Sequence, residues 1–397
     1  MKKYIALLLA LVMVFALAAC GSKEETPAPA GSEEAAAPAE TSDVKVAMIT
    51  DYGDITDQSF NQTTYEACKA FCEKNAVDFK YYKPTDDSTA ARVEMIDQAI
   101  AEGYNVVVMP GYAFAGAIVE TQDLYPDVKF VALDVSEYDI FSSFYKDGDM
   151  DGELIDPSNE PHVSANVFSA VYQEELCGYM AGVAAVKLGY TKLGFLGGMA
   201  VPAVVRYGYG FVQGCDAAAA ELGLKDVEVK YAYGNQFYGD SDITAYMDTW
   251  YSAGTEVVFA CGGGIFTSAG EAAAKVKGKV IGVDVDQAAT IDGLYGEGIT
   301  VTSAMKGLAA TVESALSAIL DGSFKGGKVD TLGLVSDVPA ENFVQIAGST
   351  QFSDSFTEED YAALVAAMNA GDVKVSNDIA AEPAVTAISV DYQGNIK

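Results

Sequence analysis

The chain has 397 residues, which is long for a single hydrophobic core and suits two domains. Hydrophobic residues make up 50%, but 57 acidic residues stand against only 24 basic ones, and the formal net charge is -33. This balance opposes a nucleic-acid partner, because phosphates need clusters of lysine and arginine and none occurs beyond Lys2-Lys3.

The N-terminus has the features of a secretory signal. Lys2-Lys3 precede an apolar run, Tyr4 to Ala16, that is too short to span a membrane as a helix. The run leads into Leu17-Ala-Ala-Cys20, which resembles a bacterial lipobox. That resemblance implies removal of residues 1–19 and a lipid on Cys20; the alternative is a simple signal peptide with an incidental cysteine. We expect a chain anchored by this lipid on the extracytoplasmic face of a bacterial cell membrane.

Residues 20–43 are predicted to be a flexible tether. They are rich in alanine, proline, glutamate, serine and threonine, a composition that cannot pack into a core. Cysteines occur again only in the part of the chain that follows, together with the single histidine, His162, which offers no set of metal ligands. We expect these cysteines to be thiols of the core: Cys68, Cys72, Cys177, Cys215 and Cys261.

From Val44 onward, short apolar runs typical of strands alternate with segments of helical period. The expected strands are 44–50, 79–82, 106–109, 128–133, 165–168, 192–196, 227–231, 256–260, 279–283 and 299–303. The expected helices include 63–74, 90–101, 178–187, 204–221, 243–253, 269–277, 308–320 and 358–369. This rhythm predicts an α/β fold with parallel sheets covered by helices on both faces, and two sheets of about five or six strands would use the length.

The alternation is broken at two places. Residues 136–163 are acidic and rich in turn formers, and we expect a loop or insertion there. Residues 323–350 carry glycines and short apolar runs instead of a long helix.

The stretch Asp51–Gln62 connects the first expected strand to the first expected helix. Its end, Ser59-Phe-Asn-Gln62, is a capping-box pattern that is expected to start the helix. The stretch is therefore a loop at the carboxyl end of a strand, where open α/β sheets bind ligands. It carries three carboxylates, an aromatic ring and an amide; a solvated acidic turn is the alternative interpretation. These residues are Asp51, Asp54, Asp57, Phe60 and Asn61.

Other polar or aromatic residues follow later strands: Asp134, Phe237, Asp284, Asp286 and Lys306. Each of them alone is typical of a helix cap or a turn. Together they offer stacking faces, worth roughly 1–3 kcal/mol for a nucleobase, and groups that exchange hydrogen bonds with hydroxyls and ring N–H. The combination favours binding of a neutral polar ring compound.

Catalytic patterns are missing from the sequence. It contains no Gly-x-Ser-x-Gly, no Walker loop and no His-Glu-x-x-His. The glycines of Gly194-Phe-Leu-Gly-Gly198 and Gly262-Gly-Gly264 lack the spacing of a dinucleotide site. With the lipobox and the tether, which suit capture and delivery of a ligand, this absence leads us to expect a binding protein that performs no chemistry and uses no cofactor or metal.

Several stretches occur in the order seen in the basic membrane protein (BMP) family of substrate-binding lipoproteins. They are Asp51 with Asp57-Gln-Ser-Phe-Asn61, Gly111-Tyr-Ala-Phe114, Tyr179-Met-Ala-Gly182, Gly194-Phe-Leu-Gly-Gly-Met199 with Pro202 and Gly210-Phe-Val-Gln-Gly214, Gly282-Val-Asp-Val-Asp-Gln287, and Thr302-Ser-Ala-Met-Lys306. The chain resembles the members that serve ABC importers of purine nucleosides. The resemblance implies a type I periplasmic-binding-protein fold, in which two lobes joined by a hinge close on a ligand. It also implies an ABC permease with its ATPase as partners, and a monomer.

The resemblance also implies roles for individual residues. Phe60 and Phe237 would stack on the two faces of the base, with Tyr233 and Tyr238 as alternatives to Phe237. Asp51, Asn61 and Asp134 would face the base or the edge of the sugar. Gly262, Asp284 and Lys306 would hold the ribose hydroxyls. With the breaks in the alternation, the lobes are expected at 44–163 plus 285–345 and at 164–284 plus 346–397.

The charge of the expected site agrees with a nucleoside. Four carboxylates, on Asp51, Asp57, Asp134 and Asp284, against Lys306 would repel the phosphate of a nucleotide. A sugar or signalling-molecule receptor of the same architecture is the alternative function. A nucleoside or glycoside hydrolase with paired aspartates is a third reading, which the lipobox and tether disfavour.

Overall fold

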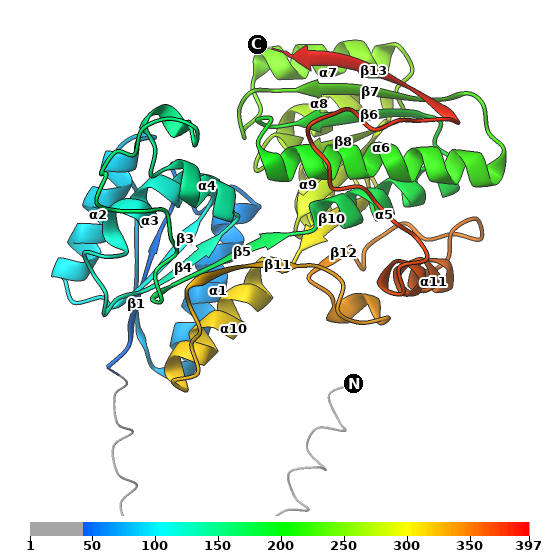
Figure 1. Ribbon diagram of the computed structural model, residues 1–397. Helices are drawn as coiled ribbons and strands as arrows, with labels where there is room; N and C mark the ends of the chain where they lie inside the picture. Colours follow the sequence, from blue (N-terminus) through cyan, green and yellow to red (C-terminus); the bar gives the residue numbers. More distant parts are fainter. Residues whose placement is uncertain (1–42, 397) are drawn as a thin grey trace, which may run out of the picture. The chain divides into compact units, whose positions relative to one another are not determined.

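The computed structural model describes residues 43–396, so the expected signal peptide, the lipidated Cys20 and the tether lie outside the described residues. Two sheets organise the described residues (Figure 1). In spatial order the first sheet contains β11 (Lys328–Leu332), β5 (Val167–Tyr172), β4 (Lys129–Leu133), β3 (Val106–Pro110), β1 (Lys45–Ile49) and β2 (Asp78–Tyr82). All of its strand pairs are parallel.

The second sheet is larger and carries one antiparallel strand. Its spatial order is β12 (Val344–Ile346), β10 (Thr300–Lys306), β9 (Lys279–Asp284), β8 (Val257–Cys261), β6 (Lys192–Gly197), β7 (Val227–Tyr233) and β13 (Ile388–Asn395). Only β12 runs antiparallel to its neighbour, β10. The α/β architecture expected from the sequence is therefore confirmed.

Alternating side chains of the buried strands explain why helices cover both faces of the first sheet. Val46 and Met48 of β1 pack into a core shared with α1 and α10, whereas Ala47 and Ile49 belong to a separate core with α2 and α3. The helices of this lobe are α1 (Phe60–Asn75), α2 (Thr89–Ala101), α3 (Ala115–Thr121), α4 (Glu137–Ser142) and α10 (Leu308–Leu320).

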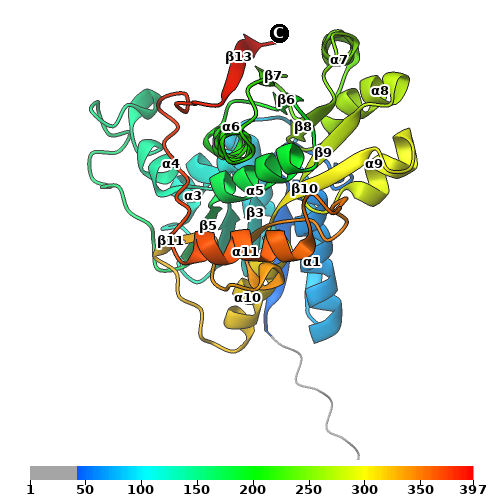
Figure 2. The same ribbon diagram turned by 90° about the vertical axis from the view of Figure 1, so that its right-hand side faces the viewer.

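The second sheet is covered in the same way. Phe195 and Phe259 pack toward α5 and α6, and Leu196 and Val258 pack toward α7 and α8. Its helices are α5 (Glu174–Lys187), α6 (Pro202–Leu222), α7 (Ser241–Ser252), α8 (Phe266–Val276), α9 (Ala288–Tyr295) and α11 (Glu358–Asn369). Figure 2 shows α5 and α6 side by side on one face.

The chain passes between the lobes three times: from β5 to α5, from β10 to α10, and from β11 to β12. The three crossings are hydrogen-bonded to one another, with Gln173 N donating to Leu332 O at 2.9 Å and Gly307 N donating to Phe343 O at 2.7 Å. They form the hinge region of the fold.

The points at which the chain crosses between the lobes differ from the lobe boundaries predicted from the sequence. β5 belongs to the first sheet, although we expected the second lobe to begin at 164. β10 belongs to the second sheet, although 285–345 was expected in the first lobe. The sheets instead divide the chain into residues 43–172 with 308–332, and residues 174–306 with 344–396. A strand's apolar run is the same whichever sheet it joins, so only the long-range pairing decides.

The stretch 136–163 contains more structure than expected. α4 lies at the start of this stretch, and its N-terminus is stabilised by a capping box. Ser136 Oγ accepts a hydrogen bond from Asp139 N, and the Asp139 side chain accepts one from Ser136 N. A short 3₁₀ turn follows at Lys146–Gly148. The remainder is a loop, as predicted.

The cysteines agree with prediction. Each of the five described cysteines is buried, and none of them forms a disulfide. No helix among the described residues is long and apolar enough to cross a membrane.

Candidate functional site

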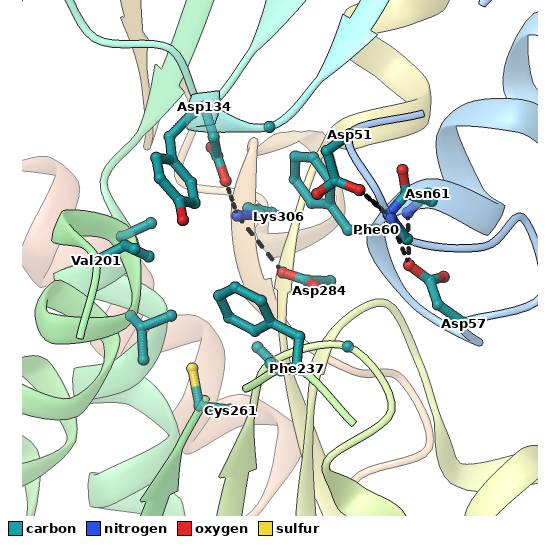
Figure 3. A pocket seen from close by; sticks show the side chains of 18 of the residues that line it. Asp51, Asp57, Phe60, Asn61, Asp134, Val201, Phe237, Cys261, Asp284 and Lys306 are labelled. Carbon is teal, nitrogen blue, oxygen red and sulfur yellow. Dashed lines mark hydrogen bonds and ion pairs between the residues drawn. The ribbon is translucent and has the colours of Figure 1, made fainter. Parts of the chain in front are cut away.

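A cavity of about 420 Å³ lies at the carboxyl ends of the strands of both sheets (Figure 3). Its size is in the range of sites for small molecules. Apart from Tyr233, the alternative to Phe237, the residues that the sequence nominated for ligand binding line it: Asp51, Phe60, Asn61, Asp134, Phe237, Gly262, Asp284 and Lys306. The structure thus brings together residues from both sheets that lie far apart in the sequence.

One end of the cavity is formed by the loop after β1. Asp51 Oδ1 accepts from the backbone N–H groups of Tyr52 and Gly53, at 2.6 Å each, and from the amide of Asn61 at 3.2 Å. Burial raises the pKa of Asp51, and these hydrogen bonds oppose the rise. Asn61 Oδ1 is buried and accepts no hydrogen bond from the described residues. It is therefore an unused acceptor at a site where an unpaired polar atom is costly.

The helix after this loop is capped differently from the expected capping box. Asp57 accepts from the backbone N–H groups of Ser59, Asn61 and Gln62 at 2.9–3.0 Å, so it shapes the loop. Ser59 makes no side-chain cap bond. Its hydroxyl instead donates to Asp284 Oδ2 of the second sheet at 2.5 Å. The Ser-x-x-Gln pattern predicted the helix start correctly but assigned its serine the wrong partner.

The aromatic rings of Phe60 and Phe237 line the middle of the cavity. A Cβ atom at Gly198 or Gly262 would come within 2.4 Å or 2.7 Å of the Phe237 ring, so both positions must be glycine for the ring to lie there. Tyr238 also lines the cavity but is exposed. Tyr233 does not line it; its hydroxyl is hydrogen-bonded to that of Tyr231 at 2.9 Å.

A buried lysine lies beside the aromatic rings and connects the two sheets. Lys306 Nζ forms an ion pair with Asp134, which follows β4, and is 3.5 Å from Asp284 Oδ1 at the end of β9. The ammonium also lies 4.7 Å from the centre of the Phe60 ring. Asp134 and Asp284 both adopt a left-handed backbone, with φ of 60° and 65°. Asp tolerates this conformation better than most residues.

Burial and charge act in opposite directions on this cluster. Burial raises the pKa of Asp134 to about 6, although the Lys306 ammonium opposes the rise. Burial alone would lower the pKa of Lys306, but the carboxylates of Asp134, Asp284 and Glu174 together raise it. Lys306 therefore stays charged. Asp134 Oδ1 has no hydrogen-bond partner among the described residues and remains open to a ligand donor.

Sequence reasoning missed Glu174 and Arg206. Glu174 has a fully buried side chain whose Oε2 accepts from Arg206 Nε at 2.6 Å, while Oε1 lies 3.8 Å from Lys306 Nζ. Arg206 lines the cavity. We expected the helix to start at 178, but α5 begins at Glu174, directly after the hinge. Two successive glutamates before a long apolar helix were the available signal, because such charges are buried only when they are paired.

The start of the 136–163 stretch contributes to the same cavity, since Ser136 and Asp139 line it. Asp54 lies at the other side, where it is exposed and paired with Lys83 at 2.9 Å. His162 is remote from the cavity lining and contacts Asp123. The described residues contain no group of His, Cys, Asp and Glu arranged to hold a metal ion. The cavity thus offers stacking faces and hydrogen-bonding groups from both lobes.

Fold and cavity together define a two-lobed binding protein. Residues 44–362 match the family model for ABC transporter substrate-binding proteins of the PnrA-like type, and the chain belongs to this Bmp family. This is a family of substrate-binding proteins of ABC transport and not a class of enzymes.

Known relatives and solved structures agree with this assignment. The chain is 27% identical over 310 residues to the ABC transporter nucleoside-binding protein BmpA of Lactococcus lactis, a match that covers 74% of this chain and 79% of that protein. It is 24% identical to an uncharacterized lipoprotein of Pyrococcus abyssi, over 79% of this chain and 72% of that protein. A solved ABC transporter solute-binding protein from Conexibacter woesei has the same fold, with a TM-score of 0.62 and 21% identity over 84% of this chain and 99% of that one.

Proposed function

We propose that this protein binds a purine nucleoside in the cavity and delivers it to an ABC permease. The observation that carries the proposal is the arrangement of three kinds of group along one cavity. The amide of Asn61 and the carboxylate of Asp51 lie at one end, and the rings of Phe60 and Phe237 lie in the middle. Lys306 follows, between Asp134 and Asp284. The name of the Lactococcus lactis relative, a nucleoside-binding protein, supports the same ligand class.

In this proposal the base lies between Phe60 and Phe237. Asp51 and the unpaired Oδ1 of Asn61 accept hydrogen bonds from its N–H groups. Asp284 and Lys306 hold ribose hydroxyls, and the backbone of Gly262 supports the sugar. Because Asp284 is buried and Asp51 is partly buried, a ligand that donates hydrogen bonds offsets the cost of desolvating these carboxylates.

A free nucleoside fits the charge of the cavity better than a nucleotide. The lining carries the carboxylates of Asp51, Asp54, Asp57, Asp134, Asp139 and Asp284. Its cations are Lys83, Arg206 and Lys306, and Lys83 is paired with Asp54. The ammonium of Lys306 is matched by Asp134, and Arg206 is matched by Glu174. No excess of positive charge remains for a phosphate.

The test is to identify the ligand that the purified protein retains. Denaturation releases it, and mass spectrometry is expected to detect a purine nucleoside. Titrations of the emptied protein with inosine, guanosine, adenosine and ribose then rank the ligands. A retained sugar, with tight binding of ribose and none of any nucleoside, would replace this proposal with a sugar receptor. Release of free base on prolonged incubation with inosine would indicate a hydrolase.

The attachment to the membrane is a separate part of the proposal. The lipobox at Leu17–Cys20 and the lipoprotein relatives support a lipid on Cys20 that tethers the protein to the extracytoplasmic face of the cell membrane. Substitution Cys20→Ser is expected to move the protein from the membrane fraction to the soluble fraction of expressing cells. Retention of the variant in the membrane would contradict the lipid anchor.

A further inference from the structure

Arg206 lines the cavity, and the proposed function gives it no role. Figure 3 shows Asp134 and Val201 on one side of Lys306, and Asp51 and Asn61 on the other side. The Glu174 carboxylate lies between the Arg206 guanidinium and the Lys306 ammonium, and Asp134 is the cavity carboxylate whose charge also acts on Arg206. The first turn of α6, which precedes Arg206, also lines the cavity.

The Arg206 guanidinium is held in place by one hydrogen bond, and its other N–H donors have no partner in the described part of the chain. Its Nε donates to Glu174 at 2.6 Å, and no terminal amino group of Arg206 donates to any residue in the described part of the chain. The Arg206 side chain is 18% exposed and lines the cavity, so these N–H groups remain available to a ligand. A guanidinium that is held at one nitrogen presents its other donors with little loss of side-chain entropy.

The packing of two helices sets this position. Gly178 and Gly182 of α5 face Gly210 and Gly214 of α6, and a Cβ on any of them would come within 2.3 Å of the other helix's backbone. The two backbones are therefore in direct contact along this seam. Glu174 at the start of α5 and Arg206 in the second turn of α6 are held at a fixed distance by that contact.

We propose that Arg206 is a specificity-determining residue that donates a hydrogen bond to the 5′-hydroxyl oxygen of the bound nucleoside. This inference rests on the proposed function. With the base near Asp51, and with Asp284 and Lys306 engaged by the 2′ and 3′ hydroxyls, the 5′ group is the part of the sugar left to reach Arg206, which Glu174 connects to Lys306. Because Glu174 neutralises the guanidinium, the donor suits a hydroxyl oxygen and not a phosphate.

The test compares inosine with 5′-deoxyinosine and 2′-deoxyinosine by titration calorimetry on the wild-type protein and on Arg206→Met. The wild type is expected to bind 5′-deoxyinosine roughly tenfold or more weakly than inosine, as for the loss of a hydrogen bond to a charged group. In Arg206→Met that ratio falls to about one, while the ratio between inosine and 2′-deoxyinosine is unchanged. Each ratio is taken within one variant, so a uniform weakening by structural disturbance cancels.

The control removes another ion pair between the same two helices. Lys187 of α5 pairs with Glu221 of α6 at 2.7 Å and does not line the cavity. Lys187→Met is expected to keep both wild-type ratios. If Arg206→Met keeps the wild-type preference for inosine over 5′-deoxyinosine, the role of Arg206 is overturned and the proposed function stands. If the wild type binds no nucleoside at all, the proposed function fails.

Discussion

At the scale of single residues, Phe60 is the side chain in which two proposed interactions meet. It lines the cavity as one of the proposed stacking faces, and its ring lies 4.7 Å from the Lys306 ammonium. In the proposed function the ring would therefore contact both the base and the cation that holds the sugar. A substitution that keeps a hydrophobic side chain but removes the ring distinguishes the contribution of stacking to the affinity from that of apolar burial.

Phe60→Leu is expected to weaken nucleoside binding by about tenfold or more, because stacking on an aromatic ring contributes roughly 1–3 kcal/mol per base. Titration calorimetry measures the effect. Phe79→Leu is the matched control, since Phe79 is also partly buried but lies on β2 outside the cavity lining. Equal affinities for Phe60→Leu and the wild type would remove Phe60 from the site.

Glu175 predicts a pH dependence of stability. Its side chain is buried with Oε2 unpaired, and burial raises its pKa from an ordinary 4.5 to about 7. Between these values the folded chain binds more protons than the unfolded chain, so stability falls as the pH rises from about 4.5 to about 7 and then levels off. The total loss is about 3 kcal/mol, from about 1.4 kcal/mol per pH unit.

Glu175→Gln removes this loss. The variant is expected to match the wild type in urea unfolding near pH 4.5 and to exceed it by about 3 kcal/mol at pH 8. The exposed Glu73→Gln, on α1, serves as the control and should show no such trend. A wild-type protein that is more stable than Glu175→Gln at pH 8 would contradict the assignment.

At the scale of elements, the contact between α5 and α6 is the feature most sensitive to substitution. Gly214→Ala would place a Cβ 2.1 Å from the Tyr179 carbonyl oxygen of the facing helix. Separation of the helices is expected to cost at least about 2 kcal/mol of unfolding free energy. Gly293→Ala is the matched control: Gly293 is in α9 with open space around its Cβ position, and alanine there should gain about 0.5–1 kcal/mol. Two variants of equal stability would contradict the close packing.

Most of the long elements could be predicted from the sequence, because a buried parallel strand is an apolar run and a surface helix ends at glycine. The elements that escaped prediction are short or partly exposed. β11 and β13 have few buried side chains, and α3 spans only 7 residues. Their patterns carry little periodicity, so their structure depends on the neighbours with which they pair.

The site was predicted unevenly for the same reason. Residues that follow a strand, such as Asp134 and Asp284, could be found because strand ends meet at one edge of a sheet. Glu174 and Arg206 could not, since their roles depend on the pairing of two helices and on the position of the hinge. The lobe boundaries required the same long-range information.

At the scale of the whole molecule, several hydrogen bonds join the lobes beside the cavity. Ser59 donates to Asp284, and Gln287 Nε2 donates to Gln58 O at 3.0 Å. The Lys306–Asp134 ion pair also connects the two lobes. Such contacts stabilise a closed arrangement over an open one, so they add to the affinity of any ligand that requires closure.

Ser59→Ala is expected to weaken nucleoside binding roughly threefold to tenfold, as for the loss of one hydrogen bond, mainly through faster dissociation. Stopped-flow displacement of bound nucleoside measures the dissociation rate. The control is Ser389→Ala, an exposed serine on β13. An unchanged dissociation rate in Ser59→Ala would show that this bond does not contribute to closure.

The measurement that tests the central claim most directly is a calorimetric titration of inosine into the wild type and Asp284→Asn. Asparagine tolerates the left-handed backbone of this position, where φ is 65°, so the variant should keep the fold and lose only the carboxylate. We predict saturable binding of one inosine per wild-type chain and a loss of roughly tenfold or more in Asp284→Asn. No binding of inosine by the wild type, or equal affinity in both proteins, would contradict a nucleoside site in this cavity.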